Sequence, residues 1–197
     1  MIPQGNPLAD LDATVSARFS EATAALRRAG ARLSEENIPS VDGFNSRDEK
    51  ILQMESYAIH RQNLLARPAD FDPYFRTMIE DGGKFTAADY IAATRERTAL
   101  VGAMDARLRD FDALVLPTVA IVAPTIAELS SGFEAFIAKT VLAVRNTAVA
   151  NFFDLCAISI PLPRQGGLPV GLMLVARNRE DRKLFRMAAA IEKLFTN

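Results

Sequence analysis

Apolar residues recur at the spacing of amphipathic helices through the first part of the chain. Between residues 12 and 29 they fall every three or four positions, and Gly30 follows where a left-handed helix cap would sit. The same spacing predicts a second helix over 46–66, which stops before Pro68. The residues that we expect on the apolar side of this second helix are Ile51, Met54, Ala58 and Leu65.

Turn and breaker residues divide the remainder of this half. Residues 31–39 predict a short edge strand that ends at Pro39, since proline cannot donate a hydrogen bond to a sheet. A turn at 69–75 leads into a short helix that the glycines at 82–83 end. A threonine followed three residues later by an aspartate then forms a capping-box pattern, which starts a long helix over 86–110.

The second half of the chain has a different pattern. Residues 112–117, 155–161 and 168–176 are short, unbroken apolar runs. Runs of this length are typical of strands that are covered on both faces. Amphipathic spacing predicts helices over 133–153 and 180–195. We therefore expect strands that alternate with helices.

These elements predict an α/β fold in which a mixed β-sheet is flanked by helices. The length favours a single domain, 1–197, with a helical region over about 1–110 and a strand-helix region over about 111–197. A dinucleotide-binding fold would need a first strand followed by a glycine-rich phosphate loop, which the sequence lacks. The glycines of "GGLPVG" lie between strands, with no helix after Gly171 to receive a phosphate. We expect no nucleotide and no other cofactor.

Composition and charge exclude several partners. The chain is 49% hydrophobic and 24% charged, and its 23 basic and 24 acidic residues leave a formal charge of -1. Because the basic residues are scattered, we expect no binding of nucleic acid. No apolar window approaches the length needed to cross a membrane, and Met1 is not followed by a secretion signal. The single cysteine, Cys156, fits a reducing compartment, so the cytoplasm is the expected location.

Few residues suggest a catalytic or metal-binding role from their sequence context alone. Cys156 lies in a predicted strand, and the only histidine, His60, is far from it in the sequence. A cysteine nucleophile needs a nearby base or a helix N-terminus, so we interpret Cys156 as a buried core residue. One histidine cannot hold zinc, and no metal site is predicted. Ser130 and Ser131 precede a glycine, as nucleophilic serines often do, but we interpret them as the N-cap of the next helix.

Two pairs of aspartates lie at predicted turns. They are Asp70 with Asp72 and Asp110 with Asp112. Short acidic side chains favour such positions because they cap helices and form turns, and this is our interpretation of all four. The spacing is also compatible with a two-carboxylate glycosidase site, although nothing else in the sequence supports one.

Three stretches of the second half carry a family resemblance. "DALVLPTVAIVAPTI" (112–126), "RNTAVANFFDLCAISIP" (145–161) and "GGLPVGLMLVARNREDRKLFRMAAAIE" (166–192) are similar, in order and spacing, to the C-terminal portion of the amidase signature family. Residues 17–39 and 89–105 resemble the helical middle region of the same family. The resemblance therefore spans essentially the whole chain but only the later part of a full-length member.

The resemblance implies a chemistry whose central parts are absent from this chain. The family transfers acyl groups through a serine nucleophile, a second serine in a cis peptide and a lysine base, with a Gly-Gly-Ser-Ser-Gly loop as the oxyanion hole. None of the five lysines here is followed by such a loop, so no catalytic residue is predicted. Amide hydrolysis needs an activated nucleophile and donors for the oxyanion. We expect this chain to be inactive alone.

The same resemblance places one segment near the acyl cleft. Its candidate substrate-binding residues are Arg145, Thr147 and Asn151. The structural alternative is that Arg145 forms a surface ion pair and the other two make hydrogen bonds at a helix end. Family members that produce glutaminyl- or asparaginyl-tRNA carry an acidic residue where this chain has Val144, so the resemblance is closer to general amidases.

Three functional hypotheses follow. The chain is the C-terminal part of an amidase, either a truncated gene product or one partner of a split enzyme whose other chain holds the nucleophile. Alternatively it is a non-catalytic remnant or binding module, or an unrelated α/β binding protein. If the rest of an amidase is missing, apolar surface becomes exposed, and we expect the isolated chain to self-associate or to be poorly stable.

Overall fold

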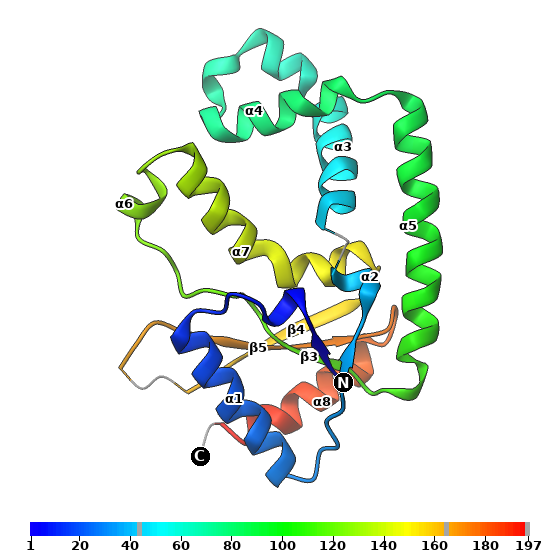
Figure 1. The fold of residues 1–197 in the computed structure, drawn as a ribbon, viewed down its shortest axis with the longest axis vertical. Coiled ribbons are helices and arrows are strands. Elements are labelled where there is room, and N and C mark those ends of the chain that lie inside the picture. Colours follow the sequence, from blue (N-terminus) through cyan, green and yellow to red (C-terminus); the bar gives the residue numbers. More distant parts are fainter. Residues whose placement is uncertain (43–44, 164–165, 196–197) are drawn as a thin grey trace.

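The structure is a computed structural model that describes residues 1–42, 45–163 and 166–195. A small sheet lies at its centre, with helices on both faces and a helical lobe that extends from one side (Figure 1). The helices are α1 (Ala13–Arg28), α2 (Pro39–Asp42), α3 (Asn45–Ala66), α4 (Pro73–Asp81), α5 (Ala87–Arg107), α6 (Ile126–Leu129), α7 (Phe133–Phe152) and α8 (Asp181–Glu192). The strands are β1 (Ile2–Gln4), β2 (Glu35–Asn37), β3 (Leu114–Pro117), β4 (Cys156–Pro161) and β5 (Gly171–Ala176). This is the predicted mixed α/β architecture.

Strand β5 is the middle strand of the central sheet. The order is β3-β5-β4, and both pairings are antiparallel. Strands β1 and β2 form a separate parallel pair, which lies beside β3 because the Val115 amide donates to the Met1 carbonyl at 2.9 Å. The strand predicted over 31–39 shortens to β2, and β1 was not predicted, since three residues are too few to show a pattern.

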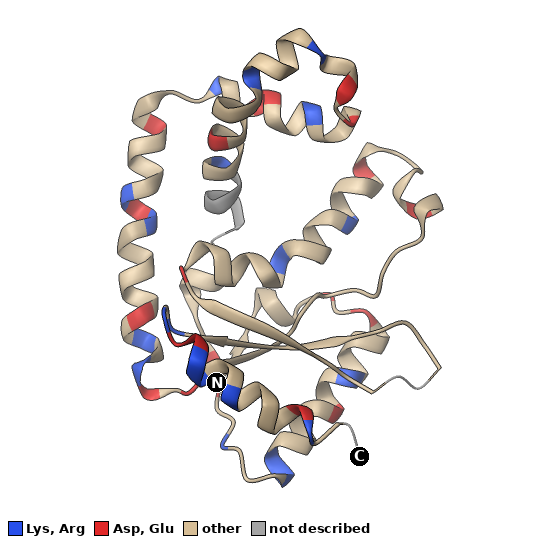
Figure 2. Cartoon of the chain, turned by 180° about the vertical axis from the view of Figure 1, so that it is seen from behind, with Lys and Arg blue, Asp and Glu red and all other residues tan. Residues whose placement is uncertain are grey.

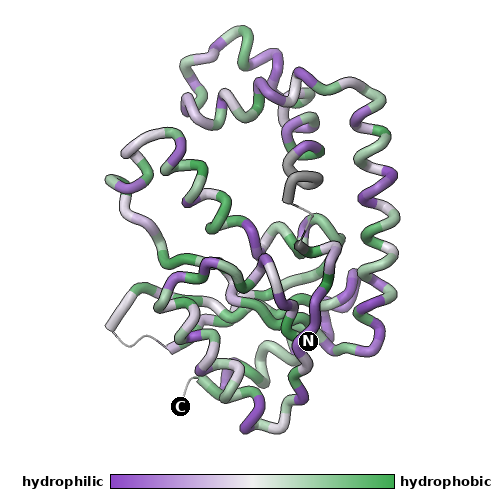
Figure 3. The backbone as a smooth tube through the Cα atoms, in the orientation of Figure 1, coloured by the Kyte–Doolittle hydropathy of each residue, from purple (hydrophilic) through white to green (hydrophobic). Residues whose placement is uncertain are grey.

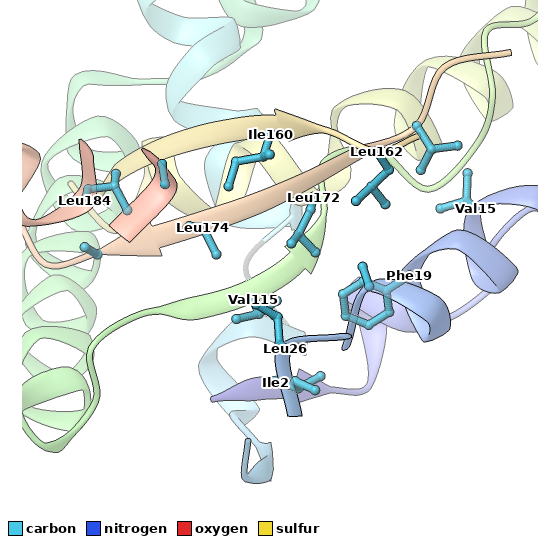
Figure 4. Packing of buried hydrophobic residues seen from close by; sticks show 14 residues of the cluster. Ile2, Val15, Phe19, Leu26, Val115, Ile160, Leu162, Leu172, Leu174 and Leu184 are labelled. Carbon is cyan, nitrogen blue, oxygen red and sulfur yellow. The ribbon is translucent and has the colours of Figure 1, made fainter. Parts of the chain in front are cut away.

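Two apolar clusters cover the opposite faces of the sheet. Side chains along β5 alternate between them, with Met173 on one face and Leu172 on the other. The hydropathy of the chain is highest along these strands (Figure 3). The cluster beneath the sheet joins α1 and α8 to the strands through Val15, Phe19, Leu26, Val115, Leu172, Leu174 and Leu184 (Figure 4). The cluster above it joins α5 and α7 through Met104, Leu108, Leu114, Val149, Phe152 and Val175. Strands β3 and β5 are therefore covered on both faces, as predicted.

Strand β4 differs from this expectation. Only Ile160 is fully buried among its six residues, whereas Ala157, Ser159 and Pro161 are exposed. The reason is its position at the margin of the sheet, where it pairs with β5 alone and α8 packs against it. The prediction of coverage on both faces is wrong for β4.

The lobe formed by α3, α4 and α5 joins the sheet region through charged contacts as well as through the buried Met104 of α5. Arg177, which follows β5, donates two hydrogen bonds to Asp105 of α5 at 2.8 and 3.0 Å and thereby lowers the pKa of that carboxyl. Arg97 of α5 contacts Asp154 and donates to the Asn151 carbonyl at the end of α7. The strands of the central sheet carry no charged residue, so charge gathers on the helices and loops around them (Figure 2).

The predicted apolar side of α3 is partly wrong. Ile51 and Met54 are buried, but Ala58 is exposed and Leu65 is 85% exposed. The neighbouring Leu64 is buried instead. Helix α4 folds back onto α3. The side of α3 that is buried near its end therefore differs from the side that is buried near its beginning. Within the described ranges, no helix is both long and apolar enough to cross a bilayer.

Helix ends confirm two predictions and correct a third. Gly30 has a φ of 92°, as expected for a left-handed cap after α1. Thr86 begins α5 with the predicted capping box. Ser130 and Ser131, however, follow the short helix α6, and the Ser131 hydroxyl donates back to a carbonyl of that helix. The N-cap of α7 is Gly132, so the prediction that these serines cap it is wrong.

A substitution at Gly82 tests the packing of the helical lobe. A Cβ at Gly82 would overlap the backbone carbonyl of Gln53 in α3, so Gly82→Ala is expected to destabilise the chain by about 1–3 kcal/mol. Gly102 in α5 has open space around it, and Gly102→Ala should stabilise by up to about 1 kcal/mol. Urea unfolding of both variants measures the difference. Equal stability of Gly82→Ala and the parent chain would contradict the packing.

Candidate functional site

Helix α7 carries all three predicted substrate-binding residues, but it does not bring them together. Arg145 is 4% exposed and lies on the buried side of the helix. Its Nη2 donates to the Ala9 carbonyl at 2.6 Å, and its Nε has no partner among the described residues. Burial lowers the pKa of the guanidinium, an effect that the carboxylate of Asp10 opposes. Arg145 does not form the surface ion pair of the structural alternative.

Thr147 and Asn151 occupy the other side of α7. They are one turn apart, so they share a helix face that is partly open to solvent. The Thr147 hydroxyl donates to the Val144 carbonyl at 2.9 Å, while the Asn151 carbonyl accepts from Arg97. Only Asn151, through its backbone carbonyl, makes the helix-end hydrogen bond that the structural alternative expects, since Thr147 lies inside α7. Their role toward a substrate stays a prediction.

Asn146 is a buried polar residue that sequence reasoning missed. It is fully buried, and its Nδ2 donates to the Pro117 carbonyl at the end of β3 at 2.8 Å. Its Oδ1 has no hydrogen-bond partner among the described residues. The hydrogen bond fixes the position of α7 relative to the sheet. In the sequence it stands between the polar residues Arg145 and Thr147, so the pattern alone does not mark it as buried.

Two hydroxyls meet at the start of β5. Thr118 and Ser159 lie 2.6 Å apart through their Oγ atoms, and the Thr118 amide donates to the Gly171 carbonyl at 2.8 Å. A Cβ at Gly171 would lie 2.5 Å from the Ser159 oxygen and 2.6 Å from the Thr118 oxygen. Gly171 is therefore a point of close approach, and the approaching groups are the hydroxyls of Thr118, which follows β3, and of Ser159, which lies within β4.

The hydroxyl pair lacks the partners of a serine nucleophile. Within the described part of the chain, neither Thr118 nor Ser159 hydrogen-bonds a lysine, a histidine or a carboxylate. Activation of a hydroxyl requires such a base. The pair can donate and accept hydrogen bonds, but it has no group in contact to remove its proton.

Cys156 is less buried than predicted, yet its environment is that of an unreactive thiol. It lies half-buried at the start of β4, and its Sγ donates to the Arg177 carbonyl at 3.1 Å. Burial and, to a smaller extent, the nearby Asp181 raise the pKa of the thiol. His60 lies in the helical lobe, edge-on to the Phe71 ring at 6.0 Å. Among the described side chains, no three potential ligands gather to hold a metal ion.

The four aspartates have structural roles of different kinds. Asp72 caps α4 through its Oδ1, as interpreted from the sequence. Asp70 forms an exposed ion pair with Arg67, and Asp112 forms one with Lys183 at 3.2 Å. Asp110 lies in the short 3-10 turn that ends the α5 segment. These carboxylates belong to separate turns.

Comparison with known proteins identifies the family of this chain. A family model described as Amidase matches residues 2–185. The 2-amino-5-chloromuconic acid deaminase of Comamonas testosteroni is 28% identical over 98% of this chain, and the match covers 42% of that protein. A fatty acid amide hydrolase of Medicago truncatula is 36% identical over 60% of this chain, and the match covers 20% of that protein. A solved amidase superposes on 99% of this chain with a TM-score of 0.80 and 26% identity, and 45% of that structure is covered.

The matches place this mixed α/β fold within a larger one. It superposes over 99% of its length on a solved amidase, of which 45% is covered. The chain belongs to the amidase family, of which it is a partial region. It spans less than half the length of the deaminase and of the solved amidase that it matches.

The reactivity of Cys156 tests its environment. Because the pKa of the thiol is raised, the thiolate is scarce at pH 7 and alkylation should be slower than in the unfolded chain. The rate should rise as the pH increases beyond the usual range of a cysteine. Reaction with iodoacetamide, with and without urea, measures this. Equal rates in the folded and unfolded chain at pH 7 would contradict it.

Proposed function

We propose that this chain is the C-terminal portion of an amidase and supplies one wall of a site that hydrolyses carbon–nitrogen bonds of amides by serine acyl-enzyme chemistry. The observation that carries the proposal is the family match through residues 2–185, combined with coverage of 42% and 45% of two larger relatives. The nucleophile, the second serine and the lysine base belong to the part that this chain lacks.

The proposed wall is the exposed face of α7. The Asn151 amide can donate to a substrate carbonyl and accept from a substrate N–H, and Thr147 can add a hydroxyl one turn away. Arg145 is buried on the opposite side, so in this proposal it positions α7 through the Ala9 carbonyl. The predicted set therefore divides into two contact residues and one positioning residue.

The substrate class is an amide, and the proposed partner is a polypeptide with the remaining amidase portion. One relative is named for a fatty acid amide and another for an amino-substituted muconic acid, so the named substrates differ between relatives. Val144 supports a general amidase over a tRNA-dependent amidotransferase subunit. We place the complex in the cytoplasm, without a metal, cofactor, nucleic acid or membrane as a partner.

A second candidate is a non-catalytic amidase-like remnant or binding module, including one that self-associates. The hydroxyls of Thr118 and Ser159 support this second candidate, because they hydrogen-bond each other and no base among the described residues. The DNA that precedes the coding sequence separates the candidates. A stretch that encodes a lysine and a Gly-Gly-Ser-Ser-Gly loop supports a split or broken amidase, and its absence supports a remnant.

The isolated chain should neither hydrolyse small amides nor react with a fluorophosphonate probe, because the resemblance carries neither the serine nucleophile nor the lysine base over to its residues. Mixed with the part of the Comamonas testosteroni relative outside the matched region, it should form a complex that reacts with the probe. Labelling followed by mass spectrometry identifies the modified chain. Labelling of a serine in the present chain would contradict the proposal.

Asn151→Ala should raise the KM of the complex for a small amide by about fivefold, since a hydrogen bond to substrate contributes about 1 kcal/mol. Asn178→Ala is the matched control, because Asn178 is also exposed but lies in the turn before α8. Steady-state kinetics of both complexes provides the measurement. If the two variants had the same KM, the Asn151 side chain would not contact the substrate.

A further inference from the structure

A pocket opens beneath the sheet, between the end of α1 and helix α8. Its volume is about 1080 Å³, and its walls come from residues 30–34 after α1, residues 110–113 before β3, and α8. Small-molecule sites in proteins commonly have volumes of about 300–1,000 Å³. The pocket lies at the start of β3, whereas Thr118 follows the end of that strand. Helix α7, which carries the proposed substrate contacts, packs on the opposite face of the sheet.

The floor of this pocket is apolar. Leu26, Val115 and Leu174 are buried side chains of the cluster beneath the sheet (Figure 4). Met187 and Ile191 of α8 continue the apolar surface and are only partly buried. An apolar group that lay on these side chains would be removed from water, which is favourable. The floor therefore favours a ligand with an apolar tail.

Five charged residues border the floor, and two of them are unpaired cations. Lys183 forms an ion pair with Asp112 at 3.2 Å, so these two charges offset each other. Arg32 belongs to the loop after α1 and Arg186 to α8, and neither guanidinium forms a hydrogen bond or an ion pair with any residue that the structure describes. Asp110 is the fifth charged residue, so a net positive charge remains. This balance favours an anionic group at the pocket.

We infer that this pocket binds a small carboxylate with an apolar tail. Arg32 and Arg186 hold the carboxylate, because a guanidinium group can donate two parallel N–H bonds to carboxylate oxygens. The tail lies against Met187 and Ile191 and reaches the buried floor. The inference does not rest on the proposed function, since the pocket uses no residue of α7.

Titration of the wild-type chain with decanoate, below the concentration at which it forms micelles, tests the pocket. The backbone amide NMR signals of Leu33, Met187 and Ile191, which line it, should shift and saturate. Decyltrimethylammonium has the same tail and the opposite charge, and acetate has the carboxylate without the tail. Each of these two compounds should bind at least about tenfold more weakly than decanoate, because each lacks one of the two recognised groups.

Substitution of the arginines separates recognition of the carboxylate from apolar adsorption. Arg32→Gln and Arg186→Gln should each raise the Kd for decanoate by about fivefold, as expected for the loss of one partly exposed ion pair. Arg28→Gln is the matched control, because Arg28 is an exposed arginine at the end of α1 that does not line the pocket. This control should bind decanoate as the wild type does. Far-UV circular dichroism confirms that each variant retains its helices.

Several outcomes would overturn the inference. Equal binding of decanoate and decyltrimethylammonium would show adsorption to apolar surface without recognition of charge. An equal loss of affinity in Arg28→Gln would reduce the effect of the arginines to the overall charge of the chain. Shifts of the pocket signals with protein concentration, in the absence of decanoate, would show that a second copy of the chain fills the pocket. Absence of saturable binding, or shifts confined to residues outside the pocket, would also overturn it.

Discussion

The structure depends on the burial of β5. This strand is the middle one of the three-stranded sheet, and its side chains alternate between two apolar clusters. Elements from both ends of the chain reach it: α1 packs beneath it together with α8, and α7 packs above it. Burial of such side chains contributes about 1.5–3 kcal/mol each, so β5 and its neighbours account for much of the stability. The other elements are arranged around this strand.

The sequence predicts this centre well because its pattern is strong. Unbroken apolar runs identify β3 and β5, and helical spacing identifies α1, α5, α7 and α8 within a few residues. The family resemblance, carried by motifs in those same elements, is confirmed by the family match. Repetition of apolar residues and ordered motifs are both properties of the chain itself, so they can be recognised without coordinates.

Predictions failed where another element decides the outcome. Leu65 fits the helical pattern of α3, yet Leu64 is buried because α4 folds over the end of that helix. Ser130 precedes a helix in the sequence, yet it ends the four-residue helix α6, which has too few residues to show periodicity. The hydroxyl pair of Thr118 and Ser159 forms only when β3, β4 and β5 align. Such sites depend on register, which single-sequence patterns do not specify.

The attachment of the helical lobe depends only in part on ionic strength. Arg177 with Asp105 and Arg97 with Asp154 join α5 to the sheet region through partly exposed ion pairs, whose strength falls as salt screens them. The apolar clusters on the sheet are insensitive to that screening. The attachment also has an apolar part, because Met104 lies in the cluster above the sheet and the Tyr74 and Phe75 rings of α4 pack on Phe136 of α7. Only the ion-pair part of the attachment is expected to weaken as the ionic strength rises.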